Sequence, residues 1–281
     1  MKILFVGGGN MAQAIIGGLL AKGAKAEDLH AIEPFADTRM ALKSLGVASA
    51  ECFLAGDLDA DIIVLAVKPQ MMKAAVAPLA GKLRRQIVVS IAAGIRCGDL
   101  ACWLGNSSAG YQNIVRTMPN TPSLIHAGIT GLYAMPGVGA SDREKAESLM
   151  AAVGQVHWFD EEAMLDAVTA VSGSGPAYVF YFIEALEQAA LELGFNATAA
   201  RAFATATFVG GARLAAGSKE SPAMLRERVT SKRGTTERAI ETFDQLQLKR
   251  HFIQGVKAAC ARSRELGDEM GRQAAAADGS S

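Results

Sequence analysis

The stretch KILFVGGGNMA, residues 2–12, decides the fold of this chain. An apolar run at 2–6 leads directly into three glycines, and a helical pattern opens at Asn10. A buried strand, a tight glycine turn and a helix in this order begin a βαβ unit, in which the helix crosses over to the next parallel strand. The stretch therefore predicts the first strand of a parallel α/β sheet.

Similar units follow along the first 160 residues. Apolar runs alternate with helical patterns near 10–22, 37–45, 70–80 and 97–104, and the runs are LHAIE (29–33), DIIVLAV (61–67), QIVVSI (86–91) and NIVRTM (113–118). Because continuous apolar runs are typical of strands buried on both faces, they predict a doubly wound, Rossmann-type α/β domain over residues 1–160. Two further runs, ITGLYAM (129–135) and QVHWF (155–159), flank a helix at 142–152 and are expected to extend the sheet.

The pattern changes near Asp160, after which only helical segments occur. They are expected at 161–171, 176–193, 198–216, 222–229, 236–244 and 247–268. We therefore expect an all-helical domain over 161–270 and a frayed tail at 271–281. The helix at 176–193 is apolar on most of its circumference, whereas a surface helix normally carries one apolar stripe. Either it lies at the centre of the domain or another subunit covers it, which predicts a homodimer through the helical domain.

The composition excludes several classes of partner. Among 281 residues, 28 basic and 28 acidic side chains balance to a net charge of zero, and the basic residues form no stripe that would bind nucleic acid or an anionic membrane. No signal peptide and no membrane span of about 20 apolar residues is expected, so a cytoplasmic protein is the default. The cysteines lack CxxC or metal-ligand spacing, and we interpret them as reduced and structural, with no metal site; they are Cys52, Cys97, Cys102 and Cys260.

The glycine turn carries the first chemical motif, G-x-G-x-x-A. Gly7 allows the tight turn, Gly9 lets the backbone approach a pyrophosphate, and Ala12 lets the helix pack closely on the strand. The helix N-terminus would then face the phosphates of a nicotinamide dinucleotide. An ordinary strand-to-helix turn is the alternative. The residues expected to bind the cofactor here are Gly7, Gly8, Gly9, Asn10, Met11 and Ala12.

Glu33 ends the second apolar run, about 20 residues beyond the glycines. An acidic side chain at this place is suited to bind the ribose 2′-hydroxyl of NAD and to repel the additional phosphate of NADP. The alternative is a solvated glutamate before Pro34.

Three more strand ends are expected along the same carboxyl edge, where an open α/β sheet binds its ligand. They are AVKP (66–69), IAAG (91–94) and RTMPNTP (116–122), and the last is a stiff loop suited to border the nicotinamide. Lys68 is equally well explained as a ligand contact or as a surface charge. The cofactor-binding residues expected here are Ala66, Val67, Lys68, Pro69, Ala92, Ala93, Met118, Pro119 and Asn120.

Six segments together resemble the pyrroline-5-carboxylate reductase family. They are GGGNMAQAIIGGL (7–19), AVKPQ (66–70), SIAAGI (90–95), RTMPNTP (116–122), VSGSGPAYVFYFIEAL (171–186) and the SKRGTTE loop (231–237), and the resemblance covers residues 1–268. Members of this family reduce a cyclic imine, L-1-pyrroline-5-carboxylate, to proline. The absence of a convincing catalytic histidine and of any lysine between Val153 and Gly217 agrees with a reaction that depends on orientation of an already electrophilic imine.

The resemblance also implies a role for the loop in RVTSKRGTTERA, residues 228–239. It implies that Ser231, Gly234, Thr235 and Thr236 bind the substrate carboxylate, with Thr236 taking the catalytic position. Helix capping by one of the two threonines is the plain alternative. The sequence departs from the family at Lys232 and Arg233, where a Pro-Gly pair is usual.

The resemblance further implies intertwined dimers, either alone or joined in a higher oligomer of dimers, and NADP(H) as cofactor. Glu33 favours NAD(H), so both cofactors stand as expectations. A related imine or keto-acid reductase is the alternative enzyme, and a non-catalytic nucleotide-binding protein is the alternative from another class.

Overall fold

The computed structural model describes the backbone of residues 1–54, 56–106 and 108–278 and the side chains through residue 272. An eight-stranded sheet forms the centre of the first compact unit, Met1–Gly173 with Ala259–Ser281. Its strands are β1 (Ile3–Val6), β2 (Leu29–Ile32), β3 (Ala48–Ala50), β4 (Ile62–Leu65), β5 (Ile87–Ser90), β6 (Ile114–Met118), β7 (Gly128–Ala134) and β8 (Gly154–Trp158). The α/β class expected from the sequence is confirmed.

The sheet has the strand order β3-β2-β1-β4-β5-β6-β7-β8. The six strands from β3 to β6 in this order are parallel to one another. The direction in which successive strands are added to the sheet reverses between β1 and β4. β7 returns antiparallel to β6, and β8 is parallel to β7. The sequence pattern located every strand except β3, which has three residues, ASA, and offers no apolar run.

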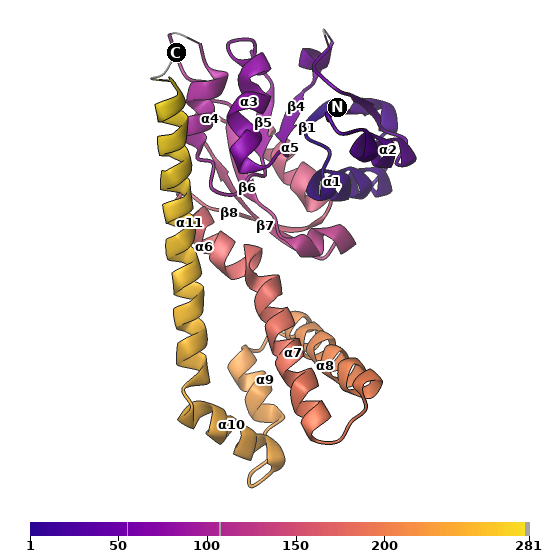
Figure 1. The fold of residues 1–281 in the computed structure, drawn as a ribbon, viewed down its shortest axis with the longest axis vertical. Helices are drawn as coiled ribbons and strands as arrows, with labels where there is room; N and C mark the ends of the chain where they lie inside the picture. Colours follow the sequence, from indigo (N-terminus) through magenta and orange to yellow (C-terminus); the bar gives the residue numbers. More distant parts are fainter. Residues whose placement is uncertain (55, 107, 279–281) are drawn as a thin grey trace. The chain divides into compact units, whose positions relative to one another are not determined.

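Helices cover both faces of the sheet (Figure 1). Side chains of β1 alternate, with Ile3 and Phe5 in one core cluster and Leu4 and Val6 in the other. The first cluster includes residues of α1 (Asn10–Ala21), α2 (Ala36–Ser44) and α5 (Ala140–Ala151). The second includes residues of α3 (Met72–Val76) and α4 (Cys97–Leu104). Burial on both faces explains why these strands lack an alternating polar pattern.

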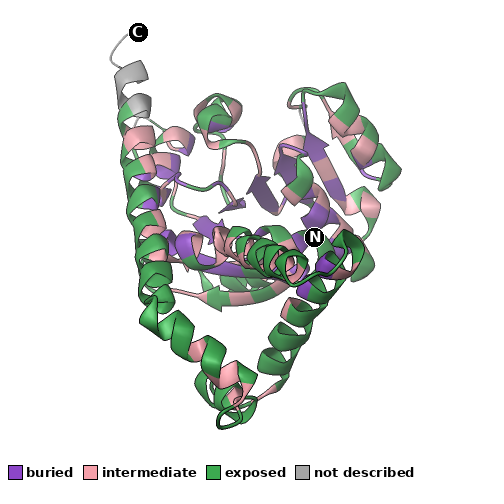
Figure 2. Cartoon of the chain, turned by 60° about the horizontal axis from the view of Figure 1, so that its bottom comes forward, coloured by how far each residue is buried: buried purple, intermediate pink, exposed green. Residues whose placement is uncertain are grey.

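The second compact unit, Ser174–Ala258, is helical. It contains α7 (Gly175–Glu192), α8 (Ala197–Gly217), α9 (Pro222–Arg228), α10 (Thr235–Gln245) and the beginning of α11 (Leu248–Asp278). The apolar helix α7 has no buried residue, and the exposed colour dominates this unit in Figure 2. Of the two explanations that the sequence left open, a central position within its own domain is therefore wrong for the single chain.

The compact units divide at Gly173, thirteen residues beyond the boundary expected at Asp160. The physical reason is that α6 (Met164–Val168) packs with the sheet through the buried Leu165. The end of α11 also belongs to the first unit: the Ser263 hydroxyl donates to the Asp166 carboxylate at 2.8 Å, and Arg96 pairs with Asp268 at 2.5 Å.

The tail expected at 271–281 is different in the structure, because α11 continues through Asp278. Residues 279–281 lie outside the described residues. Within the part of the chain that the structure describes, no helix combines the length and the apolar character needed to cross a membrane.

Two adjacent glycines of α1 predict opposite effects on stability. A Cβ at Gly18 would collide with the carbonyl oxygen of Ala152, whereas a Cβ at Gly17 meets no atom within 4 Å. Gly18→Ala should lower the free energy of unfolding by about 1 to 3 kcal/mol through overpacking. Gly17→Ala should raise it by about 0.5 to 1 kcal/mol through helix propensity. Urea unfolding of both variants checks this, and equal effects would contradict the close approach of α1 to Ala152.

Candidate active site

The carboxyl ends of β1, β4, β5 and β6 meet at one edge of the sheet, because these neighbouring strands are parallel. The backbone hydrogen bonding between neighbouring strands continues for one residue beyond the strand ends. Ala66 donates its N–H to Val6 at 2.8 Å, and Ile91 donates to Leu65 at 3.1 Å. The structure thus brings together the four segments in which the cofactor-binding residues are expected.

The glycine loop is built for close approach. Gly7 has φ +98°, and a Cβ there would lie 2.7 Å from the carbonyl oxygen of Ala66. Gly9 is the N-cap of α1, its Cα faces open space, and no side chain caps the helix. The first-turn N–H groups of α1 therefore have no intrahelical acceptor and suit the pyrophosphate of a dinucleotide. Ala12 is buried in the core, so its side chain packs against the protein and does not face a ligand.

Glu33 is buried, with 6 % of its surface exposed, so the solvated alternative is wrong. Its Oε2 accepts the N–H of Gly8 at 2.8 Å, and its Oε1 accepts the N–H of Phe35 at 3.0 Å. The carboxylate therefore ties the glycine loop to the end of β2. The Gly8 N–H is occupied by this bond, which leaves the phosphate-facing role to Gly9 and the residues after it.

Arg39 is a residue that the sequence analysis missed. Its Nη1 donates to the carbonyl oxygens of Glu33 at 2.9 Å and Pro34 at 2.7 Å, while Nη2 lies 3.9 Å from Glu51. These bonds hold a guanidinium beside the end of β2, the place where an arginine accommodates the 2′-phosphate of NADP in related folds. An arginine six residues after Glu33 is the signal that would have found it.

The other residues expected to bind the cofactor differ in their exposure to solvent. The exposed ones are Lys68 and Ala93, the half-buried ones are Ala66, Val67, Pro69 and Met118, and the buried ones are Ala92, Pro119 and Asn120. Both ends of the Asn120 amide are occupied: Oδ1 accepts the Ile129 N–H at 3.0 Å, and Nδ2 donates to the Ser172 carbonyl at 3.1 Å.

An ion pair joins the buried Arg116 of β6 to the half-buried Glu162. The Arg116 guanidinium, 4 % exposed, donates to Glu162 Oε1 at 2.9 Å, and the same oxygen accepts the Cys97 N–H at 2.8 Å. Burial, and next the charge of Glu162, raise the pKa of the Cys97 thiol, which keeps it protonated. All four cysteines are free in the structure, and no metal-binding cluster occurs among the described residues.

The loop Ser231–Thr236 leads into α10, whose N-cap is Gly234. No side chain caps this helix, so the expectation that Thr235 or Thr236 serves as its cap is wrong. Both threonines are first-turn residues, and Gly234 donates its N–H to the Ser231 carbonyl at 3.0 Å. The free N–H groups of the first turn and the nearby hydroxyls can bind a carboxylate.

Arg233 has the left-handed φ of +57°. This conformation costs a residue with a side chain roughly 1 kcal/mol, and it explains why glycine is usual in the family at this position. The Arg233 N–H donates to the Glu237 carboxylate at 2.5 Å, which stabilises the turn. The loop therefore keeps a glycine-like backbone without the glycine.

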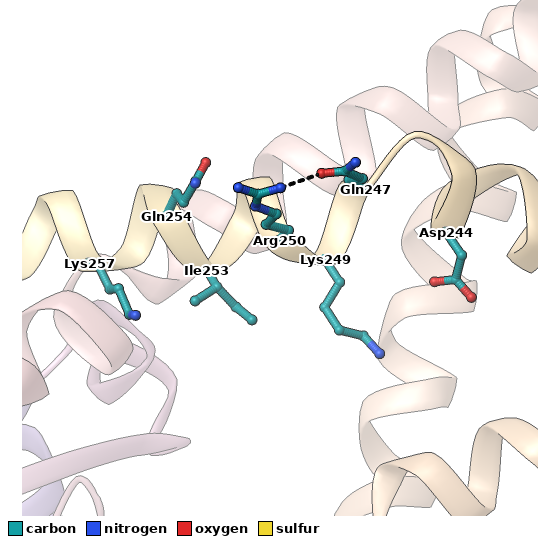
Figure 3. Close-up of a pocket in the computed structure, with 7 residues that line it drawn as sticks. All are labelled: Asp244, Gln247, Lys249, Arg250, Ile253, Gln254 and Lys257. Carbon is teal, nitrogen blue, oxygen red and sulfur yellow. Dashed lines mark hydrogen bonds between the residues drawn. The ribbon is translucent and has the colours of Figure 1, made fainter.

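Two of the hollows in the described residues each lie within a single compact unit. An open hollow of about 670 Å³ in the helical unit is lined by Lys249, Ile253, Lys257 and neighbouring residues, with Arg250 bonded to Gln247 at 2.9 Å (Figure 3). An apolar cavity of about 280 Å³ in the first unit lies beside β7, β8 and α6, and Phe159 and Met164 are among its lining residues. Neither lining contains a residue expected to bind cofactor or substrate.

Comparison with known proteins matches two parts of this chain. Residues 2–94 match a family model described as NADP oxidoreductase coenzyme F420-dependent, and residues 162–266 match one described as pyrroline-5-carboxylate reductase dimerisation. The chain is 44 % identical to a pyrroline-5-carboxylate reductase of Pseudomonas aeruginosa, covering 96 % of this chain and 98 % of the relative.

Solved structures give the same result. A pyrroline-5-carboxylate reductase from Coxiella burnetii is similar with a TM-score of 0.88 and 39 % identity, covering 94 % of this chain and 98 % of that one. A pyrroline carboxylate reductase of Plasmodium falciparum, solved with NADP bound, has a TM-score of 0.80 and 27 % identity, covering 95 % and 98 %. The expected similarity is confirmed, and the chain belongs to the pyrroline-5-carboxylate reductase family.

Proposed function

We propose that this chain reduces L-1-pyrroline-5-carboxylate to L-proline, the last step of proline biosynthesis, with the nucleotide on the carboxyl edge of the sheet and the substrate carboxylate on the Ser231–Thr236 loop. The observation that carries the substrate assignment is the uncapped N-terminus of α10, where free N–H groups and three hydroxyls gather. These donors favour a substrate whose carboxylate can reach them while its imine carbon lies beside the nucleotide. Other imines or keto acids bind as well only if their carboxylate reaches the same donors. A non-catalytic nucleotide-binding protein would share the glycine loop, but it would not need the uncapped N-terminus of α10.

The chain's own residues hold the nucleotide in this proposal. The first turn of α1 receives the pyrophosphate, and Glu33 fixes the shape of the loop through the Gly8 N–H. Arg39 stands at the end of β2 as the cation for a 2′-phosphate, which favours NADPH in spite of the nearby glutamate. NAD(H) remains the second cofactor. When bound, NADPH supplies the hydride for the ring carbon of the imine.

Binding and orientation are the tasks of the substrate loop. The first-turn N–H groups of α10 receive the carboxylate, and the Thr236 hydroxyl bonds the carboxylate or the ring nitrogen. The reduction adds a hydride to the imine carbon, and the nitrogen keeps or gains a proton, so the product is the amine. The bound imine must lie about 3 to 3.5 Å from the hydride, in line with it, and this orientation supplies most of the catalysis.

The helical region of the chain is a dimerisation domain. We propose that a second copy covers the exposed face of α7, where Val179, Phe180 and Tyr181 are among the exposed apolar residues. A larger assembly of such dimers is compatible with the remaining exposed helices. We place the enzyme in the cytoplasm, a reducing compartment in which its four free cysteines persist.

The Glu33 contact predicts a change in nucleotide binding. Glu33→Gln keeps the shape of the side chain but turns one acceptor into a donor that faces an N–H group. Loss of one charge-assisted hydrogen bond should raise the Kd of both NADPH and NADH about tenfold. Titration of each nucleotide checks this. A selective gain in NADPH binding would instead support the direct ribose contact expected from the sequence.

The substrate loop predicts a different kinetic pattern. The wild-type enzyme should oxidise NADPH on addition of pyrroline-5-carboxylate, and Thr236→Ala should lower kcat/KM about ten- to a hundredfold while the Kd of the nucleotide stays unchanged. Thr235→Ala is the matched control with a smaller effect. Gly234→Val should abolish activity, because its side chain would collide with Ser231 Oγ. A lowered Tm with wild-type kcat/KM in Thr236→Ala would remove the loop from the substrate site.

The exposed face of α7 predicts the oligomeric state. Phe180 is 66 % exposed in the helical unit, and Met40 is 61 % exposed on α2, outside the matched dimerisation region. A buried carboxylate without a partner is costly, so Phe180→Asp should weaken the dimer, whereas Met40→Asp should leave it intact. Sedimentation at micromolar concentration gives both masses. An unchanged dimer in Phe180→Asp would place the subunit contact on another face.

A further inference from the structure

Asn120 occupies a position at which its side chain would normally cap a helix. It is the N-cap of the 3₁₀ turn Thr121–Ile125, yet it makes no side-chain cap hydrogen bond. Asparagine is among the preferred capping residues because its oxygen accepts the N–H groups of the first turn. Here the side chain, 8 % exposed, is directed to two other segments.

The two bonds of the amide join the segment of Asn120 to the nearby strand β7 and to a segment that is distant in sequence. Oδ1 accepts the N–H of Ile129 at the beginning of β7, 3.0 Å away. Nδ2 donates to the carbonyl oxygen of Ser172, 3.1 Å away and 52 residues later. Ser172 belongs to the π-helical turn Thr169–Gly173, which connects α6 to the helical unit. Single π turns within helical segments occur frequently at functional sites.

This π turn lies against the carboxyl end of β6. A Cβ on Gly173 would fall 2.7 Å from Cε of Met118, the last residue of β6. Ser172 itself donates its hydroxyl to the Val168 carbonyl at 3.0 Å, a bond within the turn that does not connect it to the sheet. The Asn120 amide is therefore the polar link between the backbone of the turn and the edge where the nucleotide is proposed to bind.

We propose that Asn120 is a positioning residue for hydride transfer: by holding the Ser172 carbonyl it fixes the π turn Thr169–Gly173 against Met118, as one wall of the reductase site. This inference rests on the proposed location of the cofactor edge. It differs from the direct cofactor contact expected for Asn120, because the proposed role rests on the two bonds between the amide and backbone atoms. A displaced wall leaves nucleotide affinity unchanged but alters the distance over which the hydride moves, and such a displacement of about 1 Å lowers rates by up to a hundredfold.

The variant Asn120→Asp tests the link with little change in shape. The carboxylate still accepts the Ile129 N–H but presents an oxygen, not an N–H, to the Ser172 carbonyl. Asn113→Ala is the matched control, since Asn113 precedes β6 at its other end and donates its side-chain amide to Asp142 at 2.7 Å. The measurements are kcat, the Kd of NADP⁺, the Tm, and the deuterium isotope effect with NADPH deuterated at the transferred position.

The expected result for Asn120→Asp is a ten- to hundredfold lower kcat, a larger isotope effect, and a Kd of NADP⁺ within about twofold of the wild type. Asn113→Ala should lower only the Tm. A raised Kd of NADP⁺ with normal kcat at saturation would show direct cofactor contact, and a lowered Tm with normal kcat and isotope effect would show a purely structural role. Either outcome overturns the proposal.

Hydrogen exchange tests the same link without any turnover. Peptides that cover residues 164–176 should exchange faster in Asn120→Asp than in the wild type, and at the wild-type rate in Asn113→Ala. Unchanged exchange in Asn120→Asp would overturn the proposal even if the variant were inactive. Because this measurement needs no substrate, failure of the wild type to reduce pyrroline-5-carboxylate would count against the proposed function alone. If Asn120→Asp does not fold, Gly173→Val, which crowds Met118 directly, must give the same fall in kcat and rise in isotope effect.

Discussion

The passage of the backbone from β1 into α1 is the constraint on which the rest of the site depends. At Gly7 the chain takes a left-handed φ and passes so close to the Ala66 carbonyl that a side chain has no room. This close passage sets the N-terminus of α1 at the point where the strand order reverses, between β1 and β4. A ligand of an open α/β sheet binds at such a point, because the loops diverge there and leave a crevice.

Three charged side chains stabilise the segments around this passage, and two of them, Glu33 and Arg116, are buried. The Glu33 carboxylate holds the Gly8 N–H, and the Arg116–Glu162 pair joins β6 to the segment before α6 and to the first N–H of α4. Each charge has its hydrogen-bond partners, as buried charges require. The carboxylates of Glu33 and Glu162 accept backbone N–H groups and so maintain the position of the backbone there.

The helical unit is governed by a different constraint. Its helix α7 has no buried residue within the chain, and it lies in the region that matches the dimerisation model. The Ser231–Thr236 loop belongs to this same unit, and its turn keeps its shape although the residues at 232 and 233 differ from the family pattern. Arg233 adopts the left-handed conformation in place of a glycine, with Glu237 as the acceptor of its N–H. The sequence of the loop therefore departs from the family pattern, while its backbone still adopts the left-handed conformation that glycine favours.

The sequence by itself determined the strands of the sheet, the glycine turn at Gly7 and the order of helices, because these features depend on periodicity and on residues close together along the chain. It missed the short strand Ala48–Ala50, and it assigned Glu33 a surface or ribose role. Only the tertiary structure decided that the Glu33 carboxylate binds Gly8, that Glu162 binds Arg116 and that Asn120 binds Ser172. The partners are 25, 46 and 52 residues apart, and a hydrogen bond between such residues leaves no local pattern, since it exists only after the sheet has brought both segments to one edge.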